Sequence, residues 1–134
     1  MKNQIAGLKI LLVDDESSIQ KIITHYFKTR HQVISCNNGQ EALNWMYEGN
    51  IPDFIIADIN MPIIDGNDFI EEVKTSGFFG DIPLMMLSGM DNTDVKIKCL
   101  EAGADDFLTK PFNPRELEAR LNSIMKRVKT AEIK

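Results

Sequence analysis

Five short apolar segments recur along the chain, with more polar stretches between them. The first reads Lys-Ile-Leu-Leu-Val and the third reads Phe-Ile-Ile-Ala, without the alternation of a half-exposed strand. Runs of this length and composition are typical of strands that are buried on both faces of a parallel sheet. The predicted strands are residues 9–13, 32–36, 54–57, 83–87 and 106–108.

The stretches between the strands place their apolar residues at the spacing of one helical face. In the first of them, five apolar residues fall at positions i, i+3, i+4, i+7 and i+8. They are Ile19, Ile22, Ile23, Tyr26 and Phe27. Further helices are predicted over residues 40–48, around Phe69, Ile70 and Val73, over 93–102, and along Leu117, Leu121, Ile124, Met125 and Val128.

The last helix has a clear start signal. Asn113 is a suitable N-cap, Pro114 fits the first helical position, and Glu116 falls at the third. Five strands that alternate with five helices predict a doubly wound α/β fold, a parallel sheet with helices on both faces. We favour the strand order 2-1-3-4-5, because it places the first and third strands side by side.

The chain of 134 residues predicts one domain. We expect an N-terminal extension at residues 1–7, the folded domain at 8–128, and a polar tail or the beginning of a linker at 129–134. Nothing in the first seven residues resembles a signal peptide. No run approaches the roughly 20 apolar residues that cross a membrane, so no membrane partner is expected.

Composition narrows the function classes. Hydrophobic residues make up 43% and charged residues 26% of the chain, as in ordinary globular proteins. The net charge is −5 and no basic stripe is present, which argues against direct nucleic-acid binding. Cys36 and Cys99 lack metal-ligand spacing and are expected to pack as small apolar side chains in a reducing, cytoplasmic compartment.

Polar side chains follow four of the five predicted strands, at the point where each strand ends. An unpaired carboxylate is too costly to bury in a core, so these groups should emerge at the edge of the sheet. In open parallel sheets, ligands bind at the carboxyl ends of the strands. The residues are Asp14 and Asp15 after the first strand, Asp58 after the third, Ser88 after the fourth and Lys110 after the fifth.

These residue types together predict a site for a phosphoryl group. Three close carboxylates repel one another, and a hard divalent cation such as Mg²⁺ relieves that repulsion. Lys110 supplies a compact positive charge for an anion, and Ser88 supplies a hydroxyl donor. In such a pocket Asp58 would be the nucleophile that receives the phosphoryl group.

With these residues in order, the chain resembles the receiver domains of two-component response regulators, and the chemotaxis regulators among them, over about residues 8–128. The fold that this resemblance implies is flavodoxin-like. Each motif alone is weak evidence, whereas all of them at these spacings are specific. The matching residues are Asp14-Asp15, Asp58, Met61-Pro62, Asp65-Gly66, Ser88-Gly89 and Lys110-Pro111-Phe112.

The resemblance implies a role for each position. Asp58 would accept the phosphoryl group from a histidine kinase or a phosphotransfer protein. Asp14, Asp15, Asp58 and the backbone carbonyl of Asn60 would bind Mg²⁺ or Mn²⁺. Ser88 and Lys110 would contact the phosphoryl group, and Pro111 would follow a cis peptide bond. Phe107 would be the aromatic switch that rotates inward when Ser88 moves.

The family pattern also implies how the signal leaves the site. The face formed by the fourth helix, fifth strand and fifth helix would change and would dock a partner, a second copy or an attached output. Ile97 lies off the inward stripe of the fourth helix and is a candidate for that face.

This sequence departs from the family pattern at a few positions. Phe107 replaces a frequent tyrosine, and Ser88 replaces the commoner threonine. Met90 is apolar where many relatives are polar. We hypothesise that Met90 and Asn60 flank the phosphoryl group and tune the access of water to it.

Three other functions are weighed. A phosphatase of the haloacid dehalogenase type would need an acid two residues after its nucleophile, and Asn60 occupies that position. A pseudo-receiver that works without phosphate is disfavoured because all the site residues are present. A flavin electron carrier would need a Ser/Thr-rich loop after the first strand, where Asp14 and Asp15 stand instead. We therefore expect a phosphoacceptor without a separate turnover substrate.

Simpler structural roles also exist for single residues. Asp14 and Asp15 could cap the first helix, because acidic side chains suit a helix N-terminus. His25 and His31 have no metal-ligand spacing and are expected at the surface.

Overall fold

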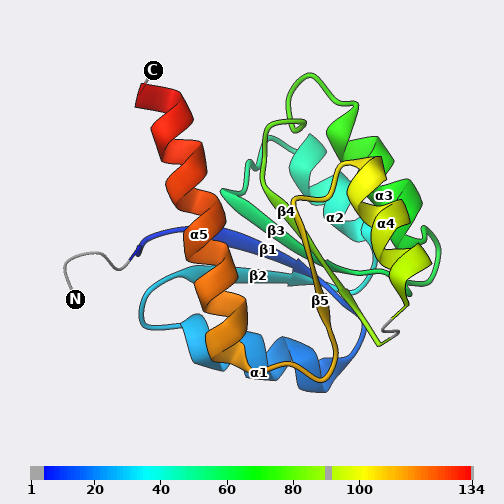
Figure 1. The fold of residues 1–134 in the computed structure, drawn as a ribbon, viewed down its shortest axis with the longest axis horizontal. Helices are drawn as coiled ribbons and strands as arrows, with labels where there is room; N and C mark the ends of the chain where they lie inside the picture. Colours follow the sequence, from blue (N-terminus) through cyan, green and yellow to red (C-terminus); the bar gives the residue numbers. More distant parts are fainter. Residues whose placement is uncertain (1–4, 90–91, 134) are drawn as a thin grey trace.

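The computed structural model describes the backbone of residues 5–89 and 92–133, and side chains as far as residue 128. Its five strands form one sheet in the order β2-β1-β3-β4-β5 with all neighbours parallel (Figure 1), which confirms the predicted topology. The strands are β1 (Lys9–Val13), β2 (Gln32–Cys36), β3 (Phe54–Asp58), β4 (Leu84–Ser88) and β5 (Asp106–Thr109).

Five helices cover the two faces of the sheet. α2 and α4 lie within one residue of their predicted bounds. α5 continues to Ile133, into the stretch 129–134 for which the sequence predicted a polar tail. α1 and α5 lie on one face, and α2, α3 and α4 lie on the other (Figure 1). The helices are α1 (Ser17–Phe27), α2 (Gly39–Tyr47), α3 (Gly66–Lys74), α4 (Thr93–Ala102) and α5 (Pro114–Ile133).

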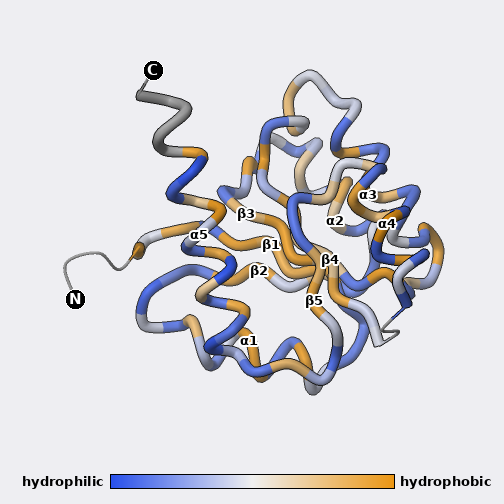
Figure 2. Tube along the Cα trace, in the orientation of Figure 1, coloured by the Kyte–Doolittle hydropathy of each residue, from blue (hydrophilic) through white to orange (hydrophobic). Residues whose placement is uncertain are grey.

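Two apolar cores lie on opposite faces of the sheet. Successive side chains of a strand point to opposite faces, so Ile10 packs with α1 and α5 whereas Leu11 packs with α2 and α3. Figure 2 shows the strands as a continuous apolar layer between the helices. Both cysteines, Cys36 and Cys99, are buried free thiols, as predicted. Within the described ranges, none of the helices combines the length and the apolar content that a membrane crossing requires.

Side chains cap the N-termini of several helices, and the cap of α5 is the one that the sequence predicted. Asn113 precedes α5 and its side-chain oxygen accepts a hydrogen bond from the Arg115 N–H at 2.9 Å. Asp65 caps α3 in the same manner through the Asp68 N–H. Asn92 caps α4, where its oxygen accepts from the Asp94 N–H at 2.8 Å. These caps satisfy backbone donors that the first helical turn leaves without partners.

His31 is buried rather than at the surface, so the prediction for this residue was wrong; His25 is exposed as predicted. The His31 Nδ1 accepts a hydrogen bond from the Leu8 N–H at 3.1 Å, which draws the ring under the start of β1. Burial, together with the nearby charge of Arg30, lowers the pKa of His31 against a weaker opposite effect of Glu118. The ring is therefore held in its neutral form.

The buried His31 gives the stability of the fold a pH dependence. Its pKa is lower in the folded state than the usual value of about 6.5, so the unfolded chain takes up the proton first. The stability that the neutral His31 ring contributes is therefore fully present above the unfolded-state pKa of about 6.5 and is lost as the pH falls below it. We expect urea unfolding between about pH 7.5 and 5 to show a smaller loss of stability in His31→Asn, which keeps an acceptor for Leu8. His25→Asn on the surface of α1 is the control, and equal slopes in all three proteins would contradict this expectation.

Candidate functional site

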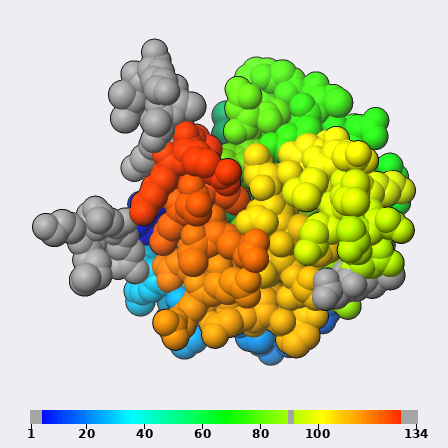
Figure 3. Space-filling model, viewed as in Figure 1, coloured from blue at the N-terminus to red at the C-terminus, as the bar shows by residue number. Residues whose placement is uncertain are grey.

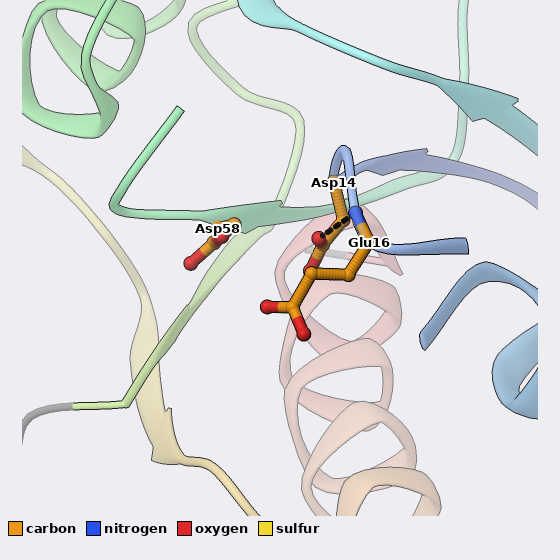
Figure 4. A group of neighbouring side chains, drawn as sticks. All are labelled: Asp14, Glu16 and Asp58. Atoms are coloured by element: carbon orange, nitrogen blue, oxygen red, sulfur yellow. Dashed lines mark hydrogen bonds between the residues drawn. The ribbon is translucent and has the colours of Figure 1, made fainter. Parts of the chain in front are cut away.

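Two carboxylates meet at the carboxyl ends of β1 and β3. Asp14 directly follows β1 and Asp58 is the last residue of β3, and the register places Val13 opposite Ala57. Both aspartates are buried although both are acidic. Figure 4 shows the Asp14 and Asp58 side chains at the same edge of the sheet, with Glu16 beside them. The sequence predicted this meeting, because parallel strands bring their carboxyl ends to one edge.

Glu16 is the third acidic member of the site, and sequence reasoning missed it. Carboxylate oxygens of Asp14, Glu16 and Asp58 all lie within 4.8 Å of one another. The turn is fixed by the Glu16 N–H, which donates to the Asp14 carboxylate at 2.9 Å. Asp15 is exposed and does not belong to this group. The signal that could have found Glu16 is its place in the acidic run Asp-Asp-Glu.

Lys110 bridges all three acidic side chains. Its ammonium lies 3.0 Å from an Asp14 oxygen, 2.7 Å from a Glu16 oxygen and 3.4 Å from an Asp58 oxygen. Burial opposes the charge of the ammonium. The hydrogen bonds that Lys110 donates to Glu16 and Asp14, together with the charges of Asp14 and Asp58, outweigh burial and raise the pKa of Lys110 to about 12. Lys110 therefore stays protonated. The peptide bond to Pro111 is cis.

Asp58 lies where its own charge is unfavourable. Burial is the main cause that raises the pKa of Asp58, and the charge of Asp14 adds to it. The charge of Lys110 and the Asn60 N–H, 3.4 Å from the carboxylate, act in the opposite direction without cancelling the effect. An additional positive charge would stabilise the ionised carboxylate.

The site can hold a hard divalent cation. Its donors are oxygens of three carboxylates that lie close together, and the single charge of Lys110 cannot neutralise all three. Such donors suit Mg²⁺ or Mn²⁺. Asp14 and Asp58 are common to the predicted ligand set and to this cluster. Asp15 lies outside this cluster of side chains, and both Asp15 and the backbone carbonyl of Asn60 stay predicted ligands.

Ser88 and Phe107 connect the site to α4 and β5. Ser88 is buried at the end of β4, and its carbonyl accepts from the Lys110 N–H at 2.7 Å. Phe107 is buried in the core beneath α4, and its role as an aromatic switch stays a prediction. The Lys96 ammonium lies 5.6 Å from the centroid of the Phe107 ring, within cation–π range. Met90 lies outside the described residues.

The loop between β3 and α3 carries a residue with a strained backbone. Ile63 has a φ of 73°, which a β-branched side chain rarely adopts, and its side chain is 77% exposed. Left-handed backbone costs about 1–2 kcal/mol for ordinary residues and less for asparagine. Backbone strain of this kind is often kept at functional sites.

Relief of this strain should stabilise the protein. We expect Ile63→Asn to raise the free energy of unfolding by about 1 kcal/mol, since little apolar burial is lost. Ile97→Asn in α4 is the matched control, because its helical backbone offers no strain to relieve, and it should be neutral or destabilising. Chemical denaturation of both variants measures the difference. If Ile63→Asn is less stable than the wild type, the contacts of Ile63 stabilise the fold by more than its backbone strain destabilises it.

The chain is similar to known proteins over most of its length. Residues 10–122 match the family model of the response regulator receiver domain. A probable transcriptional regulator, ycf27, of Guillardia theta is 40% identical over 92% of this chain and 47% of its own length. PhoP, the alkaline phosphatase synthesis regulator of Bacillus subtilis, is 37% identical over 92% of this chain and 50% of its own. The chain thus spans about half the length of these curated relatives.

Solved structures show the same fold. The receiver domain of the Francisella response regulator 1452 matches with a TM-score of 0.82 and 33% identity, over 91% of this chain and 99% of that one. The Mn²⁺-bound response regulator Rcp1 matches with a TM-score of 0.74 and 28% identity, over 87% and 91% of the two chains. With the strand order, the acidic cluster and the family match in agreement, the chain belongs to the receiver domains of two-component response regulators.

Proposed function

We propose that Asp58 accepts a phosphoryl group from a phosphohistidine of a histidine kinase or phosphotransfer protein. An Asp58 oxygen forms the new bond to phosphorus, the bond from phosphorus to the histidine nitrogen breaks, and the imidazole leaves with that electron pair. The observation that carries the proposal is the convergence of Asp14, Glu16, Asp58 and Lys110 at one edge of the sheet. We place this domain at residues 8–128 and in the cytoplasm.

The residues around Asp58 support this transfer through their charges. A bound Mg²⁺ or Mn²⁺ would neutralise negative charge on the phosphoryl oxygens. Asp14 and Asp58 would hold the ion, and we retain Asp15 and the Asn60 carbonyl as proposed ligands. The Lys110 ammonium lies close enough to Asp58 to contact a phosphoryl group bound there. Ser88, at the end of the neighbouring strand, would donate its hydroxyl.

The modified Asp58 would bias a two-state equilibrium of the α4 and β5 surface. A phosphoryl group adds charge of about −2 to the site, which attracts Lys110 and Ser88. Since Phe107 is already buried, its ring would report the change through packing against α4 and Lys96. We retain the hypothesis that Asn60 and Met90 set the access of water and hence the lifetime of the modification.

The α4–β5–α5 face is the proposed output surface. Ile97 and Leu100 of α4 are both exposed there and could contact a partner, a second copy or an attached output. We propose that this domain does not itself bind nucleic acid, because the chain carries a net charge of −5. Sedimentation with and without acetyl phosphate tests for a dimer, and loss of any dimer in Ile97→Asp would locate it.

Acetyl phosphate is a small donor that tests the central step directly. We expect the wild-type protein with Mg²⁺ to gain one acid-stable, base-labile phosphoryl group in its intact mass, and Asp58→Ala to gain none. Chelation of the cation should slow the labelling by at least about tenfold, the scale of a lost electrostatic contact in catalysis. Equal labelling of both proteins would overturn the proposal, and steady hydrolysis of small phosphate esters would favour the phosphatase alternative.

A further inference from the structure

A cluster of exposed apolar side chains lies at the end of the sheet opposite to Asp58. Phe78 is 82% exposed, Tyr47 is 59% exposed and Ile51 is 54% exposed. Single exposed apolar residues are common, but contiguous ones mark interaction surfaces. In Figure 1 the connection between α3 and β4 projects at the top of the view, whereas the carboxyl end of β4 lies at the lower right.

These side chains line a groove of about 280 Å³ between the ends of two helices. We name it the α2–α3 groove. Its base is apolar, because Met46 and Phe79 belong to the buried core beneath α2 and α3. Its ring centroids are close together, with Tyr47 and Phe78 at 5.9 Å and 6.2 Å from Phe79. Its lining side chains are Met46, Tyr47, Ile51, Ser76, Phe78 and Phe79.

The walls of the α2–α3 groove are held by hydrogen bonds. The Ser76 hydroxyl accepts from the N–H groups of Phe78 and Phe79 at 3.1 and 3.2 Å. The Lys74 ammonium donates to the Ile82 carbonyl at 2.8 Å, which ties the same segment to the end of α3. On the other wall, the Asn50 amide donates to the Trp45 carbonyl at 2.8 Å. A groove that is already formed costs less ordering when a partner binds.

The charges on the segments that line the groove indicate which kind of partner protein would bind there. The two segments that line it, residues 45–53 and 74–82, carry three acidic residues, all exposed: Glu48, Asp53 and Asp81. Their one cation, Lys74, donates to backbone carbonyls and pairs with Asp105 at 3.2 Å. A symmetric pair of copies would bring like charges together, which is unfavourable. Exposed acidic residues on both segments that line an apolar groove instead suit an apolar anchor flanked by Lys or Arg.

We propose that the α2–α3 groove docks a basic amphipathic segment of a partner protein, with an apolar side chain seated between Tyr47, Ile51 and Phe78. Aromatic side chains in a preformed pocket are the usual anchors of protein interfaces. The groove lies at the amino end of β3 and Asp58 at its carboxyl end, so both sites can be occupied together. The proposal therefore stands independently of phosphorylation.

A pair of synthetic peptides tests the groove. The probe, called the Lys peptide, is an amphipathic helix of about 15 residues with Leu and Phe on one face and Lys on the other. The control, called the Glu peptide, has Glu in place of every Lys. In two-dimensional NMR of the wild-type protein, the Lys peptide should shift the amide signals of Ile51, Phe78 and Phe79 in a saturable manner. Its affinity should fall between about 0.05 and 0.5 M salt, and the Glu peptide should not bind.

Phe78→Ser is the test variant, and it should fold because the side chain that it removes is almost fully exposed. We expect this variant to bind the Lys peptide with an affinity lower by about tenfold or more. Ile22→Ser on α1, which also removes an exposed apolar side chain, is the matched control and should bind as the wild type does. Equal binding of the two peptides, or of Phe78→Ser and the wild type, would overturn the proposal. Self-association that Phe78→Ser abolishes would also overturn it and assign the groove to a second copy.

Discussion

Lys110→Met is expected to lower the free energy of unfolding by about 3 kcal/mol in metal-free buffer, the usual cost of removing one partner from a buried ion pair. The ammonium of Lys110 lies 3.0 Å from an Asp14 oxygen and 3.4 Å from an Asp58 oxygen, and both aspartates are buried. Without it, these carboxylates repel each other in a poorly solvated place. Denaturation of the variant in the presence of a chelator measures the loss.

The same variant should bind Mg²⁺ more tightly. Lys110 contacts Asp14 and Glu16, two members of the acidic cluster, so it occupies the surroundings of any cation bound there. One unit charge at 4 Å repels a cation by about 4 kcal/mol per charge at an effective dielectric of about 20. We therefore expect Lys110→Met to raise the Mg²⁺ affinity by about tenfold or more, measured by calorimetric titration, and Mg²⁺ to restore much of the lost stability.

Lys21→Met is the control for both measurements, because Lys21 is exposed on α1. This variant should keep the wild-type stability within about 0.5 kcal/mol, as surface substitutions usually do, and leave the Mg²⁺ affinity unchanged. If Lys110→Met binds Mg²⁺ with wild-type affinity, the Lys110 ammonium does not oppose the cation and moves away from the carboxylates without a free-energy cost when Mg²⁺ binds. A Lys110→Met protein of unchanged stability would show that solvent or protonation compensates the buried carboxylates.

Gly66→Ala should destabilise the fold by about 3 kcal/mol, the upper end of the usual cost of overpacking. A Cβ on Gly66 would lie 2.5 Å from the Cα of Ile59 and 2.9 Å from its carbonyl oxygen. Both are backbone atoms, and the Gly66 N–H donates to that same carbonyl at 2.9 Å. Relief of the clash would have to move the segment directly after Asp58, so we also expect slower labelling by acetyl phosphate.

Gly77→Ala is the matched control for Gly66→Ala. No atom lies within 4 Å of a Cβ built on Gly77, and its φ does not require glycine. A substitution of this kind is neutral or stabilises by about 0.4–1 kcal/mol, because it restricts the unfolded chain. Urea unfolding of the two variants therefore separates close packing at Gly66 from any general effect of alanine. Equal stability of the two would mean that the β3–α3 loop adapts without cost.

The topology and much of the candidate site could be predicted because they depend on periodic patterns. Apolar runs predict buried parallel strands, and the carboxyl ends of such strands lie at one edge of the sheet. The sequence alone therefore predicts that Asp58 lies beside Asp14, as the register of β1 and β3 shows. Contacts that depend on side-chain conformation could not be predicted. Glu16 reaches Lys110 from a half-exposed position, and Phe107 turns inward, although other rotamers of both residues suit the same sequence.

His31 shows a second kind of limit. Its burial results from a hydrogen bond with the Leu8 N–H, a residue 23 positions earlier in the chain. A polar residue that satisfies a distant backbone group leaves no periodic signal, because local pattern records only which face of an element is apolar. Buried polar residues of this type are found only when the partner in space is known.

The apolar core between the sheet and α1 also has a consequence for synthesis of the chain. It joins Ile10 of β1 and Phe27 of α1 to Leu117 and Leu121 of α5, and the Tyr26 hydroxyl donates to Glu118 across 92 residues. A ribosome makes α5 after every strand of the sheet, so this face stays uncovered until then. The first half of the nascent chain therefore waits with exposed apolar surface, and we expect chains that stop before α5 to aggregate or to be held by chaperones.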